Sequence, residues 1–560
     1  MPSPHSRRDF LKACGAVAAS YWLHPSCSFG RDFDFIIVGG LVYDGSGKDG
    51  VFNDVGIKAG RIAALGDLKD RSAQQKIEAH GLAVAPGFID FHSHSDEELL
   101  LGGEAQSKIR QGVTTEVLGQ DGGSLAPLNE KMALQLVENF KERFGLEVAW
   151  RDFAGYFRNL EARGMISNAL SMVGQGTLRE LVIGEDNRPA TAEDLAQMKQ
   201  LAQEAFAQGA YGISSGLEYT PGSFATTEEI IELCRSMNGR GIYSTHMRNE
   251  DETLLEAIDE AIRIAREAGV ALNIAHIKAS GQRNWHKQGE MLAKLEAARA
   301  GGLQVTCDRY PYIAYNTGLS SLFPLWSRDG GDEKFVARLQ DAALQDTLRA
   351  EVWHEVEKIG GWRSVMISSL TKHPRRGEFE GKTFEEIAAT GADPFAKLFE
   401  LIIAEEGGGN MIGFAMSEED TTALLAHPYC MPASDGSALG LEGRLRRGNP
   451  HPRSFGTFPR VLGKYVRDDQ IMSMAEAIRK MSALPADTLG LKDRGYLRAG
   501  YWADVVVFDP NTVADRATWA APFQYPAGIP YVFVNGELVL AHDKLTGKLA
   551  GKVLRAPFSA

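Results

Sequence analysis

The chain has 560 residues, a formal net charge of −13 at pH 7 and 44% hydrophobic residues, ample for a globular core. This length suits two to four domains or one large barrel with attached parts. The acidic balance argues against a nucleic acid or an anionic membrane surface as the main partner. The 60 glycines favour a fold with many tight loops.

The first 30 residues have the pattern of an export signal. The basic stretch SRRDFLK at 6–12 precedes a weakly apolar run at 13–23, which is the order of a twin-arginine signal peptide. A basic cytosolic arm is the alternative reading. We therefore expect residues 1–30 to be removed and the mature protein to be periplasmic. Cys27 stands where a lipid could be attached, although HPS at 24–26 is a poor match before it.

Cysteine content and hydropathy exclude two further classes of protein. Cleavage of the signal leaves Cys234, Cys307 and Cys430, which are too few and too scattered for a disulfide framework. No later stretch is long and apolar enough to span a bilayer, so we expect no stable membrane insertion.

Short strands separated by turn residues are predicted at both ends of the mature chain. Near the start, apolar runs at 35–38 and 41–43 are bounded by glycine-containing turns. Residues 496–510 and 531–540 have the same texture. We expect residues 32–82 and 493–560 to form one small β-sandwich built from both termini.

Strand and helix patterns alternate through residues 83–325 and 428–492. Eight apolar segments are predicted to be strands: 84–94, 113–119, 169–174, 211–216, 241–246, 271–276, 303–310 and 430–435. The intervening segments predict helices, such as those at 192–208, 227–238, 253–267 and 289–299. Eight strands with crossover helices predict an α/β fold, a parallel (β/α)8 TIM barrel.

The interval before the eighth strand, residues 326–427, is long. It contains helical patterns at 332–358 and 384–405. We expect it to be an inserted helical subdomain near the barrel mouth.

The first barrel strand ends in two histidines on one face. His92 and His94 are two residues apart, so they project together with Asp90 one pleat below them. Two imidazoles so placed can chelate a divalent metal, although a single His-x-His also fits ordinary loop histidines. Further polar residues follow other strands, and these ends meet on one rim of such a barrel. The candidate metal ligands are His92, His94, Asp121, His246, His276 and Asp435.

The spacing of these ligands makes a two-lobed site plausible. His92, His94 and Asp435 could hold one ion and His246 and His276 another, with Asp121 as a bridge. Imidazole and carboxylate ligands suit Zn²⁺, as one or two ions, with other divalent metals possible. A bound metal lowers the pKa of water to roughly 7. Asp435 could then transfer the water's proton to a leaving nitrogen, or serve as a ligand only.

Cationic and phenolic side chains near the same strand ends are candidates to bind substrate. Lys278 and Arg248 each lie two residues beyond a ligand histidine. Lys278, Tyr310 and Arg453 are candidates to hold a carboxylate. A solvated charge at the rim is the alternative for Lys278 and Arg248.

Many long segments, in order, resemble the D-aminoacylase (N-acyl-D-amino-acid deacylase) family of the amidohydrolase superfamily. The resemblance covers the whole mature chain. Its segments are PGFIDFHSH at 86–94, GGSLAP at 122–127, GISSGLEYTPG at 212–222, THMRNE at 245–250, IAHIKASG at 274–281, YPY at 310–312, SDG at 434–436, HPR at 451–453 and GTFPR at 456–460.

The resemblance implies roles for these residues. It implies a tightly held zinc on Asp121, His246 and His276, and a weaker second site on His92, His94 and Asp435. It makes Asp435 the catalytic aspartate and assigns the substrate carboxylate to Lys278, Tyr310 and Arg453. The fourth strand ends in SSG at 214–216, without the carboxylated lysine of many amidohydrolases.

Two positions depart from the family pattern. Asp121 stands where well-studied deacylases carry a cysteine, and an oxygen ligand binds zinc less tightly than a thiolate. Asn316 stands where those relatives carry a serine that touches the substrate carboxylate; its amide can still donate a hydrogen bond. Both changes would suit a sister group with another amide substrate.

The sequence thus predicts a periplasmic metallohydrolase that cleaves a C–N amide bond by means of metal-bound hydroxide. The expected small-molecule substrate is an N-acyl-D-amino acid, which would be hydrolysed to a carboxylate and a free D-amino acid. The alternatives are a dipeptidase for D-residues, a cyclic amide hydrolase, and a non-catalytic periplasmic protein that binds a small acidic ligand. The number of subunits stays open, with a homo-oligomer among the possibilities.

Overall fold

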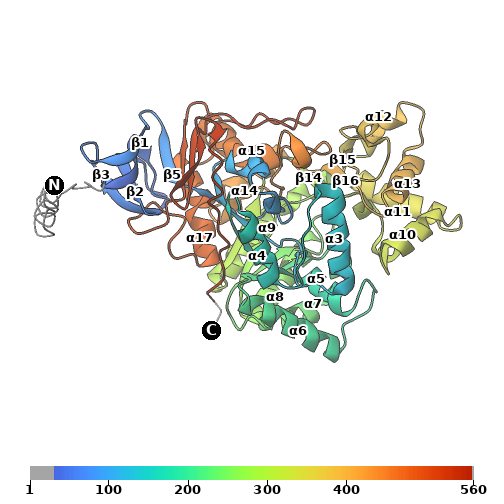
Figure 1. The fold of residues 1–560 in the computed structure, drawn as a ribbon. Coiled ribbons are helices and arrows are strands. Elements are labelled where there is room, and N and C mark those ends of the chain that lie inside the picture. The colour runs from blue at the N-terminus through green and yellow to red at the C-terminus, as the bar shows by residue number, and fades with distance from the viewer. Residues whose placement is uncertain (1–30, 558–560) are drawn as a thin grey trace, which may run out of the picture.

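The computed structural model describes residues 31–557, so the predicted signal peptide, with Cys14 and Cys27, lies outside the described residues. Three parts lie in a row: a terminal β-sheet at one end, a barrel in the middle and an insertion at the other end (Figure 1). The predicted α/β fold is confirmed.

The terminal sheet contains strands from both ends of the described chain. Its order is β21-β20-β19-β18-β5-β1-β2-β3, with β4 beside β1. The bounds are β1(Phe33–Val42), β2(Val51–Lys58), β3(Arg61–Gly66), β4(Ala73–Glu78), β5(Ala83–Pro86), β18(Val505–Phe508), β19(Tyr531–Val534), β20(Glu537–Ala541) and β21(Lys544–Leu545). Ile37 and Val55 from the first half share one core with Val505 and Phe533 from the second. The two ends therefore form one unit, in which hydrogen bonds join all nine strands into a single sheet.

The strand predicted over 84–94 is two strands. β5 pairs with β1 and β18 in the terminal sheet, whereas β6(Phe88–Asp90) pairs with β7 in the barrel. Gly87 lies at the break, where a Cβ atom would come within 2.3 Å of the Thr114 side chain. This close approach lets the chain pass directly from the sheet into the barrel.

The barrel has eight parallel strand positions, as predicted. Its strands are β6, β7(Val113–Leu118), β8(Asn168–Ser171) with β9(Val173–Gly174), β10(Gly212–Gly216), β11(Ile242–His246), β12(Ala271–Ile274), β13(Val305–Arg309) and β17(Cys430–Pro432). The third position is split, since β8 pairs with β7 and β9 pairs with β10. A bridge between Ser93 and Gly436 joins the first and last strands and closes the barrel.

Amphipathic helices surround these strands. In α8(Leu254–Ala268), Ile258, Ile262 and Ala265 are buried at helical spacing, and Gly269 ends the helix in the left-handed conformation. The other main helices outside the insertion are α2(Gln106–Ile109), α3(Glu130–Phe144), α4(Phe153–Arg163), α5(Gln175–Val182), α6(Ala192–Ala207), α7(Thr227–Arg235), α9(Gln288–Ala300), α14(Glu418–Ala426), α15(Arg453–Arg460), α16(Met474–Met481) and α17(Ala483–Leu489). The four helices predicted between strands are confirmed to within a few residues.

The insertion has its own hydrophobic core and is not purely helical. Its elements are β14(Ala314–Gly318), α10(Asp332–Gln340), α11(Gln345–Lys358), β15(Val365–Ser369), α12(Phe384–Ala388), α13(Pro394–Ala404) and β16(Asn410–Phe414). The strands form an antiparallel sheet in the order β14-β16-β15, which the sequence analysis missed. It begins at β14, earlier than expected, and α14 packs on barrel strands β13 and β17.

Each long helix expected in the insertion is two shorter helices. Asp341 leaves the helical conformation after α10. Asp393 caps α13, whose first residue is Pro394. Proline is favoured at the first position of a helix and disfavoured within it, so a new helix begins at Pro394.

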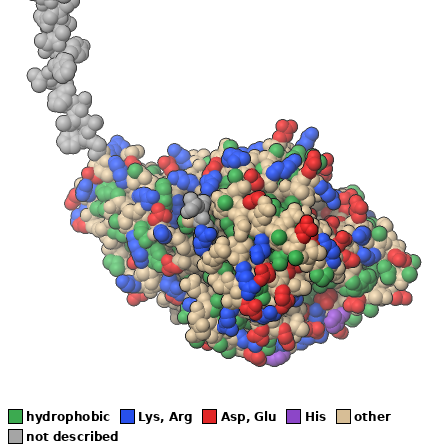
Figure 2. Space-filling view, turned by 90° about the horizontal axis from the view of Figure 1, so that it is seen from below, with side chains coloured by type: hydrophobic (Ala, Val, Ile, Leu, Met, Phe, Trp, Pro, Cys, Tyr) green, Lys and Arg blue, Asp and Glu red, His purple; other side chains and the backbone are tan. Residues whose placement is uncertain are grey.

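Across residues 31–557, no helix combines the length and apolar character needed to cross a bilayer. Lys and Arg side chains are interspersed with Asp and Glu on the face seen in Figure 2. That face therefore lacks the continuous basic area expected of a nucleic-acid interface.

Candidate active site

The six predicted metal ligands converge at the carboxyl ends of the barrel strands. Their ligand atoms form two groups, each within 4.8 Å: His92, His94, Asp121 and Asp435 in one, and Asp121, His246 and His276 in the other. The structure thus brings together both predicted lobes, and Asp121 belongs to each.

Asp121 follows β7 and lies between the four histidines. Its Oδ1 is 3.4 Å from His92 Nε2, and its Oδ2 is 3.4 Å from Nε2 of both His94 and His276. The same Oδ2 is 3.9 Å from His246 Nδ1. Asp121 therefore faces the histidines of both lobes, so its carboxylate could bridge two metal ions.

The charges of this cluster favour a bound cation. Burial would raise the pKa of Asp121, but His92 and His276 hold that pKa well below its ordinary value. Burial lowers the pKa of His94, but Asp121 and Asp435 raise it by more. The result is a pKa of about 9 for His94. Without a metal ion, the acidic groups of the cluster would thus keep His94 protonated at neutral pH. A divalent ion would supply the same positive charge and take the imidazole lone pairs instead.

The donor set fits zinc. It consists of imidazole nitrogens and carboxylate oxygens, which are ordinary Zn²⁺ ligands. The buried Oδ1 of Asp121 has no hydrogen-bond partner among the described residues. Unpaired buried polar atoms are costly in proteins, and a metal ion would satisfy this one.

Three ligand histidines have a second carboxylate at the ring nitrogen that points away from the lobe. Asp308 Oδ1 is 3.3 Å from His92 Nδ1, and Glu218 Oε2 is 3.3 Å from His246 Nε2. Glu250 Oε1 is 3.0 Å from His276 Nδ1. Such partners fix the tautomer and ring orientation of metal-ligating histidines.

Sequence reasoning missed these three carboxylates as site residues. Asp308 lies at the end of a predicted strand and Glu250 lies in the THMRNE segment. Their position near the ends of predicted strands is the signal that could have marked them as site residues. Their pairing with particular histidines depends on contacts between different strands.

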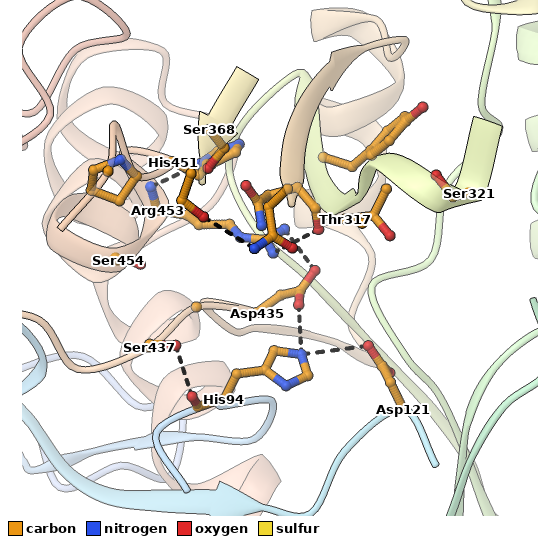
Figure 3. A pocket seen from close by; sticks show the side chains of 18 of the residues that line it. His94, Asp121, Thr317, Ser321, Ser368, Asp435, Ser437, His451, Arg453 and Ser454 are labelled. Carbon is orange, nitrogen blue, oxygen red and sulfur yellow. Dashed lines mark hydrogen bonds and ion pairs between the residues drawn. The ribbon is translucent and has the colours of Figure 1, made fainter. Parts of the chain in front are cut away.

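Asp435 joins the metal lobe to the substrate side of the cavity. Its Oδ1 is 3.0 Å from His94 Nε2, and its Oδ2 accepts a hydrogen bond of 2.7 Å from Arg453 Nη1 (Figure 3). Burial would raise the pKa of Asp435, but Arg453 and the histidines hold it far below its usual range. The carboxylate is therefore ionised at neutral pH.

A buried ion pair supports Asp435 from beneath. Lys108 Nζ is 2.5 Å from Asp90 Oδ2 and also donates to Ser434 Oγ. Asp90 accepts from both the backbone amide and the hydroxyl of Ser434, at 2.9 and 2.6 Å. The backbone amide of Asp435 donates to the His92 carbonyl at 2.8 Å. This network fixes the ends of β6 and β17 relative to each other.

A cavity of about 1010 Å³ opens above the cluster and is lined by Lys278, Tyr310, Asn316 and Arg453, as predicted for substrate-binding residues. The Tyr310 hydroxyl and Asn316 Oδ1 are buried without a hydrogen-bond partner among residues 31–557. Arg453 is stacked on Tyr310, with its guanidinium carbon 4.8 Å from the ring centroid. These groups can bind a carboxylate-bearing ligand directionally.

Arg248, also predicted to bind substrate, is not placed with this set of residues. Its guanidinium donates to both oxygens of Glu260 and to the carbonyls of Ser223 and Ala225. It is absent from the cavity lining. The Arg248 guanidinium is thus engaged by Glu260 on α8 and by two backbone carbonyls rather than by the cavity.

Comparisons with known proteins agree with this geometry. The model of the amidohydrolase family matches residues 75–352 and 444–540. A D-aminoacylase of Alcaligenes xylosoxydans xylosoxydans is 40% identical, over 94% of this chain and 99% of its own length. An N-acyl-D-glutamate deacylase from the same organism is 36% identical, over 93% of this chain and 96% of its own.

Solved structures show the same likeness. The N-acyl-D-glutamate deacylase of Bordetella bronchiseptica, complexed with zinc and a phosphonate inhibitor, has a TM-score of 0.78 and 34% identity, covering 94% of this chain and 100% of that one. A D-aminoacylase with a binuclear metal center has a TM-score of 0.76 and 37% identity, covering 93% and 100%.

Proposed function

This chain belongs to the amidohydrolase family, and on that basis we propose that it hydrolyses N-acyl-D-amino acids to a carboxylate and a free D-amino acid. The observation that carries the proposal is the meeting of six ligands beside a cavity with carboxylate-binding groups. Relatives matched over nearly their full length include a D-aminoacylase and deacylases of N-acyl-D-glutamate and N-acyl-D-aspartate.

The metal lobes would hold the electrophile. Zn²⁺ held by Asp121, His246 and His276, with a second ion at His92, His94 and Asp435, would polarise the amide carbonyl and activate water at neutral pH. The attacking water forms the new C–O bond and the C–N bond then breaks.

Asp435 moves the proton. Its ionised carboxylate can accept a proton from the attacking water and return it to the departing nitrogen. Arg453 holds one oxygen while His94 faces the other, so the carboxylate keeps one orientation during the transfer.

The cationic and phenolic groups that line the cavity beside Asp435 would orient the substrate carboxylate. Lys278 and Arg453 supply positive charge, and the unpaired Tyr310 hydroxyl supplies a donor. Holding this carboxylate places the amide next to the metal lobes and contributes to catalysis by positioning.

A substrate panel with metal control tests the proposal. Purified protein is stripped by a chelator, reloaded with Zn²⁺ and incubated with N-acetyl-D-amino acids, their L-enantiomers, dipeptides ending in a D-residue, and hydantoins. We expect amine release from the N-acetyl-D-amino acids, lost on chelation and restored by zinc. Full activity after exhaustive chelation, or turnover of the L-enantiomers or hydantoins alone, would contradict it.

We also propose that the protein is exported to the periplasm by the twin-arginine route. Support comes from the SRRDFLK segment at 6–12 and the apolar run that follows it. Cell fractionation should place the wild-type protein in the periplasm and retain a variant with Arg7→Lys and Arg8→Lys in the cytoplasm. Equal distribution of both proteins would disprove the route.

A further inference from the structure

We propose that Glu250 is a positioning residue shared by the metal-ligating His276 and the carboxylate-binding Lys278. One buried side chain contacts both, so it would couple metal affinity to recognition of the substrate carboxylate. The inference rests on the proposed function for the role of Lys278.

The contacts of Glu250 are short and buried. Its Oε1 is 3.0 Å from His276 Nδ1, and its Oε2 is 2.5 Å from Lys278 Nζ. The Lys278 ammonium also donates to the His276 carbonyl at 3.0 Å and lies 2.9 Å from Nδ1. Glu250 is 6% exposed and Lys278 is 3% exposed. Water therefore cannot replace either partner without a rearrangement.

The tautomer of His276 follows from this arrangement. Its Nε2 faces Asp121 at 3.4 Å and must carry a lone pair to bind a metal. Nδ1 lies 2.9 Å from the Lys278 ammonium, which can only donate a hydrogen bond. Once a metal takes the Nε2 lone pair, the proton of the neutral ring would move to Nδ1, and Glu250 Oε1, 3.0 Å away, is the acceptor within reach. Glu250 consequently uses one oxygen for the metal ligand and the other for the ammonium.

The backbone reinforces the link between the two strand ends. Glu250 lies in the segment after β11, whereas His276 and Lys278 follow β12. The Ser280 amide donates to the Glu250 carbonyl at 2.7 Å. The loop that carries Lys278 is thus fastened to the residue that orients its side chain.

Asp308 provides a matched comparison. It faces His92 Nδ1 at 3.3 Å and accepts from Asn273 and the His276 amide. No ion pair joins Asp308 to Lys278 within the part of the chain that the structure describes. Loss of its charge should affect the metal lobe without changing recognition of the substrate carboxylate.

The test compares Glu250→Gln with Asp308→Asn in two assays. A glutamine has one acceptor oxygen, so either the His276 N–H or the ammonium loses its partner. Zn²⁺ titration of the stripped proteins should show affinity weakened by about 10–100-fold in both variants. Kinetics then compare an N-acetyl-D-amino acid with its neutral C-terminal amide.

We expect Glu250→Gln to lose kcat/KM for the acid about tenfold more than for the amide, mainly through KM, which corresponds to one charged hydrogen bond. Asp308→Asn should lower kcat/KM for both substrates equally. An unchanged acid-to-amide ratio in Glu250→Gln, or unchanged zinc affinity, would overturn the proposal while leaving the deacylase function intact. An inactive wild-type protein would instead overturn the deacylase function.

A second variant guards against misfolding. Glu250→Asp keeps the charge but shortens the side chain by one methylene, so it cannot reach both partners. It should show the same two effects at smaller size, with a melting temperature near that of wild type. Wild-type values in both assays would also refute the shared role.

Discussion

At the scale of single residues, the candidate metal centre is built on unusual backbone conformations. Asp121, His276 and Asp435 have φ values of 52°, 33° and 49°, in the left-handed region that favours glycine. Such conformations cost of order 1–3 kcal/mol each and are retained where the surrounding structure enforces them. Here they turn three ligand side chains inward at strand ends, which is consistent with a functional origin of the strain.

Replacement of Asp435 by asparagine tests proton transfer. The amide oxygen can still accept from Arg453, but it cannot take a proton from water. We expect kcat to fall by about 10²–10⁴-fold, the usual contribution of a general acid–base group. Zinc content, measured by atomic absorption, should persist at Asp121, His246 and His276. A kcat near that of wild type would show that another group moves the proton.

A pH-dependent contribution to stability is expected from His451. This buried ring donates from Nε2 to the Ala314 carbonyl at 2.9 Å and accepts at Nδ1 from the Arg453 amide at 3.0 Å. Burial, and then repulsion by Arg453, holds its pKa well below the ordinary value. Below the unfolded-state pKa of about 6.5, the unfolded chain binds a proton that the folded protein excludes, so stability falls as pH falls.

His451→Gln removes this titration. We expect its stability relative to wild type to improve by about 1.4 kcal/mol between pH 7.5 and pH 5.5, as measured by chemical denaturation. The comparison is internal, because all other groups titrate in both proteins. A constant difference across this pH range would mean that folded His451 accepts a proton.

At the scale of elements, the contact between β6 and β17 depends on the buried pair of Lys108 and Asp90. Lys108→Met should destabilise the protein by about 3–5 kcal/mol, because Asp90 is left as a buried charge without a cation. Urea denaturation measures the loss. The double variant with Asp90→Asn should lose less than the single variant, since the uncompensated charge is gone. A single variant of wild-type stability would show that Ser434 alone satisfies Asp90.

The sequence predicted elements and ligands whose signals are local. Strand ends, the His-x-His pair and the later histidines follow from hydrophobic runs and the polar residues after them, and the four helices follow from their periodicity. Features that depend on distant partners were missed. The break at Gly87 depends on Thr114, and the role of Arg248 depends on Glu260. The sheet of the insertion pairs β14 with a strand about a hundred residues later.

At the scale of the whole molecule, a buried polar network joins the terminal sheet to the barrel. Asn535 Nδ2 donates to Asn168 Oδ1 on β8 at 2.7 Å. The backbone amide of Asn535 donates to the Asp504 carboxylate at 2.7 Å, and Arg494 forms an ion pair with the same carboxylate. The sheet therefore braces the end of the barrel that is remote from the metal ligands.

The last residues of the chain extend this support. The Gly551 amide donates to the Met165 carbonyl at 2.8 Å, and the Leu554 amide donates to the Ala169 carbonyl at 2.7 Å. A chain ending at residue 547 should melt at a lower temperature, since these bonds and the cover over Gly164 are lost. Its zinc affinity and kcat at low temperature should match those of the full chain. Loss of zinc binding in the folded, shortened protein would show that the tail acts on the metal centre.

The order of strands in the terminal sheet has a consequence for biosynthesis. β5 lies between β1, near the beginning of the chain, and β18, more than four hundred residues later. When the ribosome has made the whole barrel, β5 can already pair with β1, but its second neighbour, β18, has not yet been synthesised. Until then the edge of β5 that faces β18 stays unpaired, so the sheet can be completed only after residues 505–508 have left the ribosome, and this edge is open to intermolecular pairing in the meantime.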